Sequence, residues 1–360
     1  MSLTLAVVGS GSLARATCLA LSTADTPGLA GLKVVLLARD VAAATQICHV
    51  SSVRAAVSGR TARFTAVPVD PTDPDAVAGA LAADRPDGVL VCASTHSPWE
   101  PADRPSAWTA LVGRAGFGLT LPFQAEVALA VGAAIRRSCP EAFLVNACFP
   151  DAVNPLLAAC GVPVRAGVGN VGIVAAALQS ALGLPDQGRL HVVGHHLHLH
   201  APADPADEAL VWLDGARLDN VTELLAPHRT TRGGRGNNDI TGLLAARAVA
   251  ALLTGATEET HLPGVAGLPG GYPVRTTAGE VALRLPLGVD VDQAVDANRR
   301  WAMRDGALVE DGQVRFGPAV TGALAPLLPA YADGFAAGSV TEATAAFHAL
   351  RERLRSQAAS

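Results

Sequence analysis

The sequence predicts an α/β protein, in which a doubly wound parallel sheet is followed by a mixed α+β domain that holds the substrate. Two observations support this prediction. Short apolar, β-rich runs alternate with helical patterns through the first half of the chain. A glycine-rich turn directly follows the first of those runs. We expect a dinucleotide-binding domain over residues 1–150 and a substrate domain over residues 151–360.

The glycine-rich turn has the sequence GSGSLARATCLALS, in which Gly9, Gly11 and Ala14 have the spacing of a dinucleotide-binding motif. The first glycine permits a tight turn, and the second lets a pyrophosphate approach the backbone. The following helix begins with Ser12 and Leu13, whose N–H groups and helix dipole favour phosphate. The turn therefore predicts a Rossmann-type site for a nicotinamide dinucleotide.

The remaining elements continue the alternation of strands and helices. Strands are expected at 33–39, 64–70, 88–94, 142–147 and 162–170, and helices at 74–83, 126–140, 174–183 and 339–354. The fourth strand ends at Ser94, which we expect beside the nicotinamide ribose. The segment after it is rich in Pro and Trp, which is typical of a loop over a cleft.

The end of the second strand favours NADP over NAD as the cofactor. An acidic residue there usually holds the 2′-hydroxyl of NAD, whereas this strand ends in Ala38-Arg39-Asp40. A small residue followed by Arg39 leaves room for a 2′-phosphate and offers a guanidinium to bind it. The alternative is NAD, with Arg39 stacked on adenine and Asp40 on the ribose.

Composition limits the partners and the catalytic groups. The net charge is −5 without a basic block, which argues against nucleic acid. No apolar run spans a bilayer without a polar or Pro interruption, and the six scattered cysteines indicate free thiols in a reducing cytosol. The only lysine, Lys33, opens a predicted strand, which excludes a Tyr-x-x-x-Lys dyad. We expect a cytoplasmic homodimer or higher homo-oligomer that acts on a small molecule, with no nucleic-acid or membrane partner.

The order of motifs resembles the lactate/malate dehydrogenase family. After the glycine turn, the family's landmarks recur at Asn146, Pro150-Asp151, Gly161-Val162-Pro163, Arg165, Gly194-His195-His196 and Thr241. The resemblance implies hydride transfer between nicotinamide and a small polar carbonyl or hydroxyl substrate. It also implies that Asn146 positions the nicotinamide amide or the substrate oxygen, that His196 is the acid/base, and that Thr241 lines the pocket.

Two departures from the family affect the chemistry. Ile173 and Ala176 stand where the family has the Asp that orients the histidine and the Arg that holds the substrate carboxylate. The imidazolium is therefore expected to lack a carboxylate partner, and the substrate is not expected to be an ordinary 2-hydroxy acid. Two alternatives remain: an imine-reducing dehydrogenase of the opine or saccharopine type, which shares the N-terminal half of the pattern, and a non-catalytic dinucleotide sensor.

The stretch VVGHHLHLH, residues 192–200, concentrates the chain's histidines. On a strand, His196, His198 and His200 would share one face and could hold zinc or copper. The other interpretations are a single catalytic histidine or a polar strand edge without chemistry. We expect no metal and a catalytic His196, in preference to His195, with His96 as a rival acid.

The segment HRTTRGGRGNNDITG, residues 228–242, contains Arg229, Arg232 and Arg235 ahead of an apolar helix. We expect a loop that brings a replacement carboxylate clamp or phosphate donors to the cleft. The alternative is a flexible surface loop.

Overall fold

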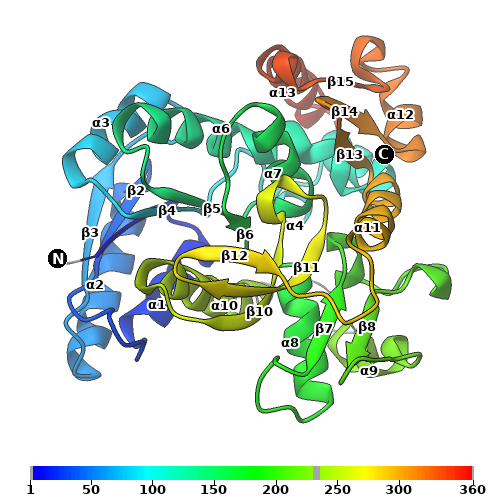
Figure 1. Ribbon diagram of the computed structural model, residues 1–360. Coiled ribbons are helices and arrows are strands. Elements are labelled where there is room, and N and C mark those ends of the chain that lie inside the picture. Colours follow the sequence, from blue (N-terminus) through cyan, green and yellow to red (C-terminus); the bar gives the residue numbers. More distant parts are fainter. Residues whose placement is uncertain (1–2, 230–235, 359–360) are drawn as a thin grey trace.

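The computed structural model describes residues 3–229 and 236–358. Its first unit is a parallel sheet with the strand order β3-β2-β1-β4-β5-β6 (Figure 1). This order is that of a doubly wound Rossmann sheet, so the predicted fold class is confirmed. The strands are β1 (Thr4–Val8), β2 (Lys33–Ala38), β3 (Arg63–Pro68), β4 (Gly88–Val91), β5 (Phe143–Asn146) and β6 (Ala166–Gly167).

The central strands of this sheet are mostly apolar because both faces of the sheet are covered. Leu5 and Val7 of β1 belong to one core, and Ala6 and Val8 belong to the other, as the alternation of side chains along a strand requires. Figure 1 shows α3 and α6 on one side of the sheet and α1 and α10 on the other. The helices of this unit are α1 (Ser12–Ser22), α2 (Val41–Val57), α3 (Pro74–Asp84), α6 (Leu121–Ser138), α7 (Pro150–Ala159) and α10 (Gly236–Thr254).

The sixth strand is shorter than the sequence predicts. β6 has 2 residues, whereas the pattern suggested 162–170. It lies beyond residue 150 and pairs with β5, so the first sheet extends past the boundary expected from sequence. Helix α8 (Val171–Ala181) follows directly and leads away from the sheet.

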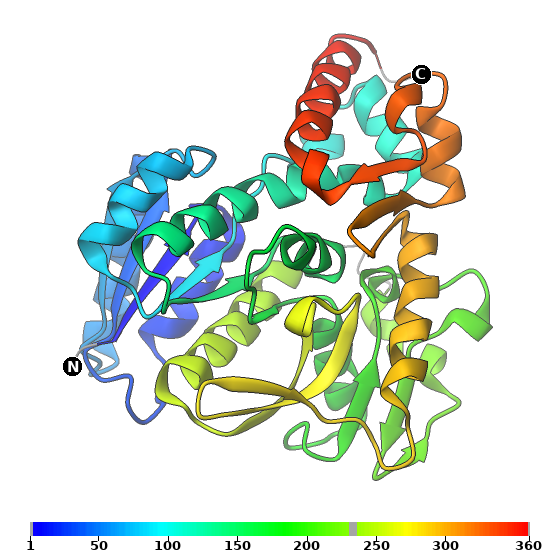
Figure 2. The same ribbon diagram turned by 45° about the horizontal axis from the view of Figure 1, so that its top comes forward.

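The rest of the chain forms three antiparallel sheets, which confirms the mixed α+β character of the second half. Figure 2 shows α13 and the last sheet beside the helices that precede β5, so the end of the chain packs on the first unit. The strands are β7 (Leu190–Val193), β8 (Leu210–Leu213), β9 (Ala216–Arg217), β10 (Glu258–Pro263), β11 (Gly271–Thr277), β12 (Glu280–Leu283), β13 (Ala307–Glu310), β14 (Gln313–Phe316) and β15 (Gly334–Ala336). The helices are α4 (Glu100–Asp103) and α5 (Ala107–Ala115), which precede α6, and α9 (Val221–Arg229), α11 (Val291–Asp305), α12 (Pro318–Leu324) and α13 (Val340–Arg355).

The histidine-rich stretch is not the strand that the sequence suggested. β7 ends at Val193, and a 3₁₀ helix, η2 (His196–Leu199), follows it. The backbone of Gly194 pairs with that of Gly271 through hydrogen bonds of 2.7 and 3.1 Å. The N–H of His195 then donates to Nδ1 of His198 at 2.8 Å, a local side-chain contact that competes with strand pairing. The prediction of three histidines on one strand face is therefore wrong.

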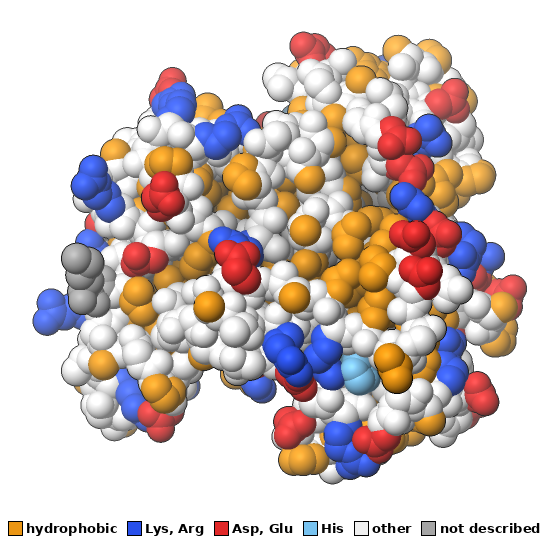
Figure 3. Space-filling model, in the orientation of Figure 1, with side chains coloured by type: hydrophobic (Ala, Val, Ile, Leu, Met, Phe, Trp, Pro, Cys, Tyr) orange, Lys and Arg blue, Asp and Glu red, His pale blue; other side chains and the backbone are white. Residues whose placement is uncertain are grey.

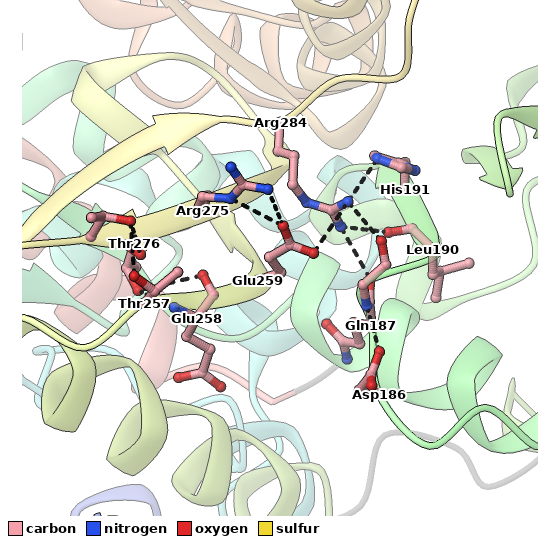
Figure 4. Close-up of polar contacts among 12 residues, drawn as sticks. Asp186, Gln187, Leu190, His191, Thr257, Glu258, Glu259, Arg275, Thr276 and Arg284 are labelled. Carbon is pink, nitrogen blue, oxygen red and sulfur yellow. Dashed lines mark hydrogen bonds and ion pairs between the residues drawn. The ribbon is translucent and has the colours of Figure 1, made fainter. Parts of the chain in front are cut away.

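A polar cluster holds β7 against the sheet formed by β10, β11 and β12 (Figure 4). Arg284 donates to the carbonyl oxygens of Gln187 and Leu190 at 3.1 and 3.0 Å, and its Nη1 lies 2.8 Å from Nε2 of His191. Glu259 lies 3.7 Å from Arg284 and supplies the opposite charge. The cluster fixes the strand that leads into η2 and gives His191, which directly precedes the histidine-rich stretch, a structural contact.

Two features bear on the expected partners. The stretch Phe117–Ser138 is 22 residues long with a mean hydropathy of 1.4, so by length and composition it resembles a membrane span. Since 78% of its most apolar window is buried, it also fits the interior helix of a folded domain, and a single such helix is weak evidence for a membrane. On the face seen in Figure 3, basic and acidic side chains are interspersed.

Candidate active site

A cavity of about 980 Å³ lies at the carboxyl ends of β1, β4 and β5, where open α/β sheets bind their ligands. Elements from the second half of the chain close its other side. Of the predicted site residues, Gly11, Ser12, Leu13, Ser94, His196 and Thr241 line this cavity. Gly9, Arg39 and Asn146 do not.

The glycine turn forms a backbone cradle at one end of the cavity. Gly9 has φ +122°, and a Cβ there would lie 3.1 Å from Cβ of Ala93, so the turn requires glycine. A Cβ on Gly11 would meet no protein atom within 4 Å, because this position faces open space. The side chain of Asn238, at the start of α10, donates to Oγ of Ser12 at 2.6 Å. The residues of the cradle fit a dinucleotide pyrophosphate, since backbone is exposed at a helix N-terminus.

The end of β2 lies outside the main cavity. Arg39 and Asp40 are both exposed. Oδ1 of Asp40 accepts the N–H of Ala43 at 2.9 Å, so this carboxylate caps α2. In a doubly wound sheet this edge faces the adenosine end of a dinucleotide, and Arg39 is the basic side chain there.

A histidine–carboxylate pair lies at the end of the cavity opposite the glycine cradle. Nδ1 of His196 lies 3.0 Å from Oδ2 of Asp305, and the two side chains are 18% and 9% exposed. Asp305 is the last residue of α11, 109 residues further along the chain. The N–H of His196 also donates to Asp151 at 3.0 Å. The expectation that His196 lacks a carboxylate partner is therefore wrong, because Asp305 is such a partner.

This pairing sets the charge state of both groups. Burial alone would lower the pKa of His196, but the charge and hydrogen bond of Asp305, with the charge of Asp151, raise it above its ordinary value. Burial opposes ionisation of Asp305, yet the same contact with His196 holds its pKa below the ordinary value. The pair therefore favours an ionised Asp305 and an imidazolium at His196.

The neighbouring histidines have other surroundings. His195 is fully buried with Nδ1 3.5 Å from Asp305, and burial lowers its pKa. His198 is 1% exposed and donates to the carbonyl of Asp207 at 2.8 Å, while burial lowers its pKa to about 3. His200 is exposed at the rim of the cavity. Within residues 3–229 and 236–358, no three His, Cys, Asp or Glu side chains are placed to hold a metal ion.

The rival acid, His96, lines the cavity but has the wrong charge state for proton donation. It is 5% exposed, and burial, reinforced by two nearby arginines and opposed by Glu100, lowers its pKa to about 4. A neutral imidazole at physiological pH accepts a proton rather than donating one. His196 is therefore the better candidate for the acid.

The side-chain amide of Asn146 forms its hydrogen bonds within the protein. Its Nδ2 donates to the carbonyl of Cys148 at 3.0 Å and to Oδ1 of Asn154 at 2.9 Å. Its Oδ1 accepts the N–H of Cys148 at 2.9 Å. This amide stabilises the turn between β5 and α7, so the geometry gives no support to its predicted contact with nicotinamide or substrate. Asn170, which donates to Asp151, lines the cavity instead, and the sequence analysis did not select it.

Thr241 reaches the cavity because α10 lies very close to α1. A Cβ on Gly242 would lie 2.4 Å from Cβ of Ala16, so the absence of a side chain permits this approach. Thr241 is 6% exposed and packs near Gly169. Its predicted place at the pocket agrees with the structure.

The predicted arginine-rich loop is largely helical in the part that the structure describes. Residues 236–242 belong to α10, and Arg229 ends α9. Arg229 donates to Glu208 at 2.7 Å and to the carbonyl of His198 at 3.1 Å, so it supports η2 rather than facing the cavity. Arg232 and Arg235 lie outside the described residues.

The segment after β4 covers the cavity, as its composition predicted, and the end of the chain holds it. Trp99 lines the cavity, and the neighbouring Glu100 is only 5% exposed. Arg355 of α13 donates to both oxygens of Glu100 at 2.6 Å. Arg351, one turn earlier, donates to the carbonyl of Thr95 at 2.6 Å. We name this set of contacts the clasp.

The fold and the cavity together define a doubly wound α/β architecture with a cavity at the carboxyl ends of its strands. No protein-family model and no curated protein matches the chain. Its fold nevertheless matches crystal structures of malate and lactate dehydrogenases. Malate dehydrogenase from Cryptosporidium parvum is 15% identical with a TM-score of 0.55, over 85% of this chain and 98% of that one. The lactate dehydrogenase from the same organism, complexed with lactic acid and nicotinamide adenine dinucleotide, is 16% identical with a TM-score of 0.55, over 85% and 97%. Malate dehydrogenase from Archaeoglobus fulgidus, in complex with NADH, is 15% identical with a TM-score of 0.53, over 83% and 95%. The chain has the lactate/malate dehydrogenase fold.

Proposed function

We propose that the protein is an NAD(P)-dependent oxidoreductase that transfers a hydride between nicotinamide and the carbonyl or hydroxyl carbon of a small molecule. The observation that carries this proposal is the His196–Asp305 pair, which opens onto the same cavity as the glycine cradle. An acid/base group and a dinucleotide cradle are the two components that such a transfer requires.

The reduced nicotinamide, when bound, supplies the hydride. In the direction of reduction, Nε2 of His196 donates a proton to the carbonyl oxygen, while Nδ1–H remains hydrogen-bonded to Asp305. Asp305 stabilises the imidazolium before transfer and keeps the ring oriented after it. The N–H contact from His196 to Asp151 fixes the backbone beneath the ring. In oxidation, the neutral imidazole accepts the hydroxyl proton.

NADP is the proposed cofactor, and NAD is the alternative. Support comes from the exposed Arg39 at the end of β2 and from Asp40, one of whose oxygens is engaged in capping α2. One oxygen of Asp40, the carboxylate that would hold a ribose 2′-hydroxyl, therefore already accepts a backbone hydrogen bond. The guanidinium of Arg39 remains available for a 2′-phosphate. Cytoplasmic location, homo-oligomeric assembly and the domain boundary at residue 150 stay predictions from sequence.

The non-catalytic sensor is less well supported than it was from sequence. Part of the case for it was the missing carboxylate partner of the histidine, and Asp305 supplies that partner. An imine-reducing dehydrogenase would use the same pair, with a nitrogen in place of the carbonyl oxygen.

The pH dependence of reduction tests the pair. Reduction requires protonated His196, so kcat/KM should fall as pH rises through its raised pKa. Asp305→Asn removes the carboxylate, so this fall should move to lower pH. The rate should also drop by roughly ten- to a hundredfold, as expected for about 1.5–3 kcal/mol from a hydrogen bond to a charged group.

The matched control is Asp296→Asn, which removes a 58% exposed carboxylate from the same helix. It should leave both the profile and the rate unchanged. A pH profile of Asp305→Asn that coincides with the parent's would exclude the pair as the acid/base.

A further inference from the structure

The walls of the cavity near His196 are apolar and aromatic. Phe117 stacks on the His196 ring with a centroid distance of 4.6 Å and an interplanar angle of 23°. Phe149 meets the same ring edge-on at 5.3 Å. Ile173 and Leu199 also line the cavity, and both are only half-buried. Half-exposed apolar side chains that converge on one cavity indicate a ligand whose body is apolar.

The charges at this end of the cavity disfavour an anion. Asp305 is the one carboxylate among the described lining residues, and no Lys or Arg is among them. The positive charge of His196 is already paired with Asp305 at 3.0 Å. Among the residues that the structure describes at this end, a substrate carboxylate would find no cationic partner of its own to offset the hydration that it loses.

One position joins the two observations. Ile173, which stands where the resembling family has its Asp, itself faces the cavity. The carboxylate function has moved to Asp305 on a different helix. The vacated position thus adds apolar surface where the bound substrate would lie.

We propose that the substrate of this site is an uncharged carbonyl compound, or the corresponding alcohol, whose body is apolar. The proposal rests on the proposed function, because it identifies the molecule that accepts the hydride. The carbonyl oxygen faces Nε2 of His196, and the body lies against Phe117, Ile173 and Leu199. Hydride addition to the carbonyl carbon and protonation of its oxygen by His196 give the alcohol, and the dihydronicotinamide is oxidised.

The first test compares two non-reacting probes of nearly the same shape, of which one is neutral and the other is an anion. Binding of 2-phenylacetamide and of phenylacetate is measured by calorimetry near pH 7.5, on the full chain saturated with NADPH. We expect the neutral amide to bind at least about tenfold more tightly, since the anion must be desolvated without a partner. Equal or tighter binding of phenylacetate overturns the proposal.

Variants of the wall show whether binding occurs at this end of the cavity. Ile173→Asn should lower the affinity for the amide by roughly ten- to a hundredfold, which corresponds to about 1.5–3 kcal/mol for a buried aliphatic side chain. Leu243→Asn is the matched control, because Leu243 is 55% exposed on α10 and does not line the cavity. Leu199→Asn is the second variant, in case Ile173→Asn does not fold. Unchanged affinity in the folded wall variants overturns the proposal.

Turnover separates failure of this inference from failure of the proposed function. NADPH oxidation is followed with phenylacetaldehyde and with phenylpyruvate. Preference for the aldehyde supports the inference. Preference for the 2-oxo acid overturns it and leaves the oxidoreductase intact. No turnover with either compound, together with no binding of either probe, overturns both.

Discussion

The two ends of the cavity are built in different ways. The cradle consists of consecutive residues whose side chains are mostly small or absent, so backbone N–H groups and a helix dipole are what it offers to a phosphate group. The opposite end consists of charged and aromatic side chains from separate elements, with His196 on η2, Asp305 on α11 and Phe117 before α6. The cradle thus depends on local conformation, whereas the acid/base end depends on how distant elements pack.

This contrast predicts how each end fails. A substitution in the cradle should remove cofactor binding while the fold and the histidine pair stay intact. A substitution at the acid/base end should leave cofactor binding intact and slow the chemical step. The contrast would be false if a substitution at the acid/base end removed cofactor binding, or if a substitution in the cradle disrupted the histidine pair.

The largest effect is expected from Gly11→Val. Its side chain would enter the open space at the cradle rather than any protein atom, because a Cβ there meets nothing within 4 Å. We expect binding of NADPH and NADH to become undetectable by calorimetry, with an unchanged circular dichroism spectrum. Gly79→Val is the control, since Gly79 on α3 is equally unobstructed but does not line the cavity. Retained nucleotide binding in Gly11→Val would exclude the cradle as the pyrophosphate site.

The next largest effect is expected from His196→Asn. Turnover should fall by roughly two to four powers of ten, the usual contribution of general acid–base catalysis, with unchanged affinity for NADPH. His200→Asn is the control, because His200 also lines the cavity but is exposed. Parent-like turnover in His196→Asn would exclude His196 as the acid.

His198→Asn should instead lower thermal stability, since the buried ring of His198 bridges the backbone of His195 and Asp207.

The same contrast explains how much could be predicted from the sequence. The parallel sheet and the cradle could be predicted from local patterns: apolar runs that alternate with helical patterns, and glycines at a fixed spacing between a strand and a helix. The strand order came only from the structure. The resemblance in motif order placed His196 and Thr241 at the cavity. These features need only a few neighbouring residues to be recognised.

What the sequence did not reveal depends on contacts between distant residues. Asp305 ends a helix before Gly306, whose left-handed conformation is common after a helix, and nothing local marks Asp305 as the partner of a residue 109 positions away. The alternation His-Leu-His-Leu-His has a strand's period, yet the contact from His195 to His198 bends it into a 3₁₀ helix. Asn146 matched its motif but its amide is used inside the turn. A strong alternation or motif match therefore does not establish which atoms face a ligand.

A smaller effect at the cradle end is expected from Arg39→Ala. Loss of charge-assisted hydrogen bonds to a 2′-phosphate should make NADPH binding less favourable by roughly 1–3 kcal/mol. Binding of NADH should be almost unaffected, because NADH lacks that phosphate. Calorimetric titration of both nucleotides measures the difference. Equal affinities for NADPH and NADH in the parent protein would contradict the NADP preference and favour Asp40 as the ribose ligand.

The smallest effect is expected from the clasp, which joins the loop over the cavity to the last helix. Arg355→Ala leaves Glu100 without the guanidinium that binds both of its oxygens. Since Arg355 is 34% exposed, solvent screens part of the loss, and we expect about 1 kcal/mol, or roughly a fivefold increase in the open population of the loop. Trp99 should then be quenched more readily by acrylamide, and KM should rise while kcat changes little. Arg353→Ala, an arginine on the same helix that does not contact the loop, should change neither. If Arg355→Ala and Arg353→Ala behave alike, the helix only packs against the loop, and access to the acid/base end does not depend on the ion pair.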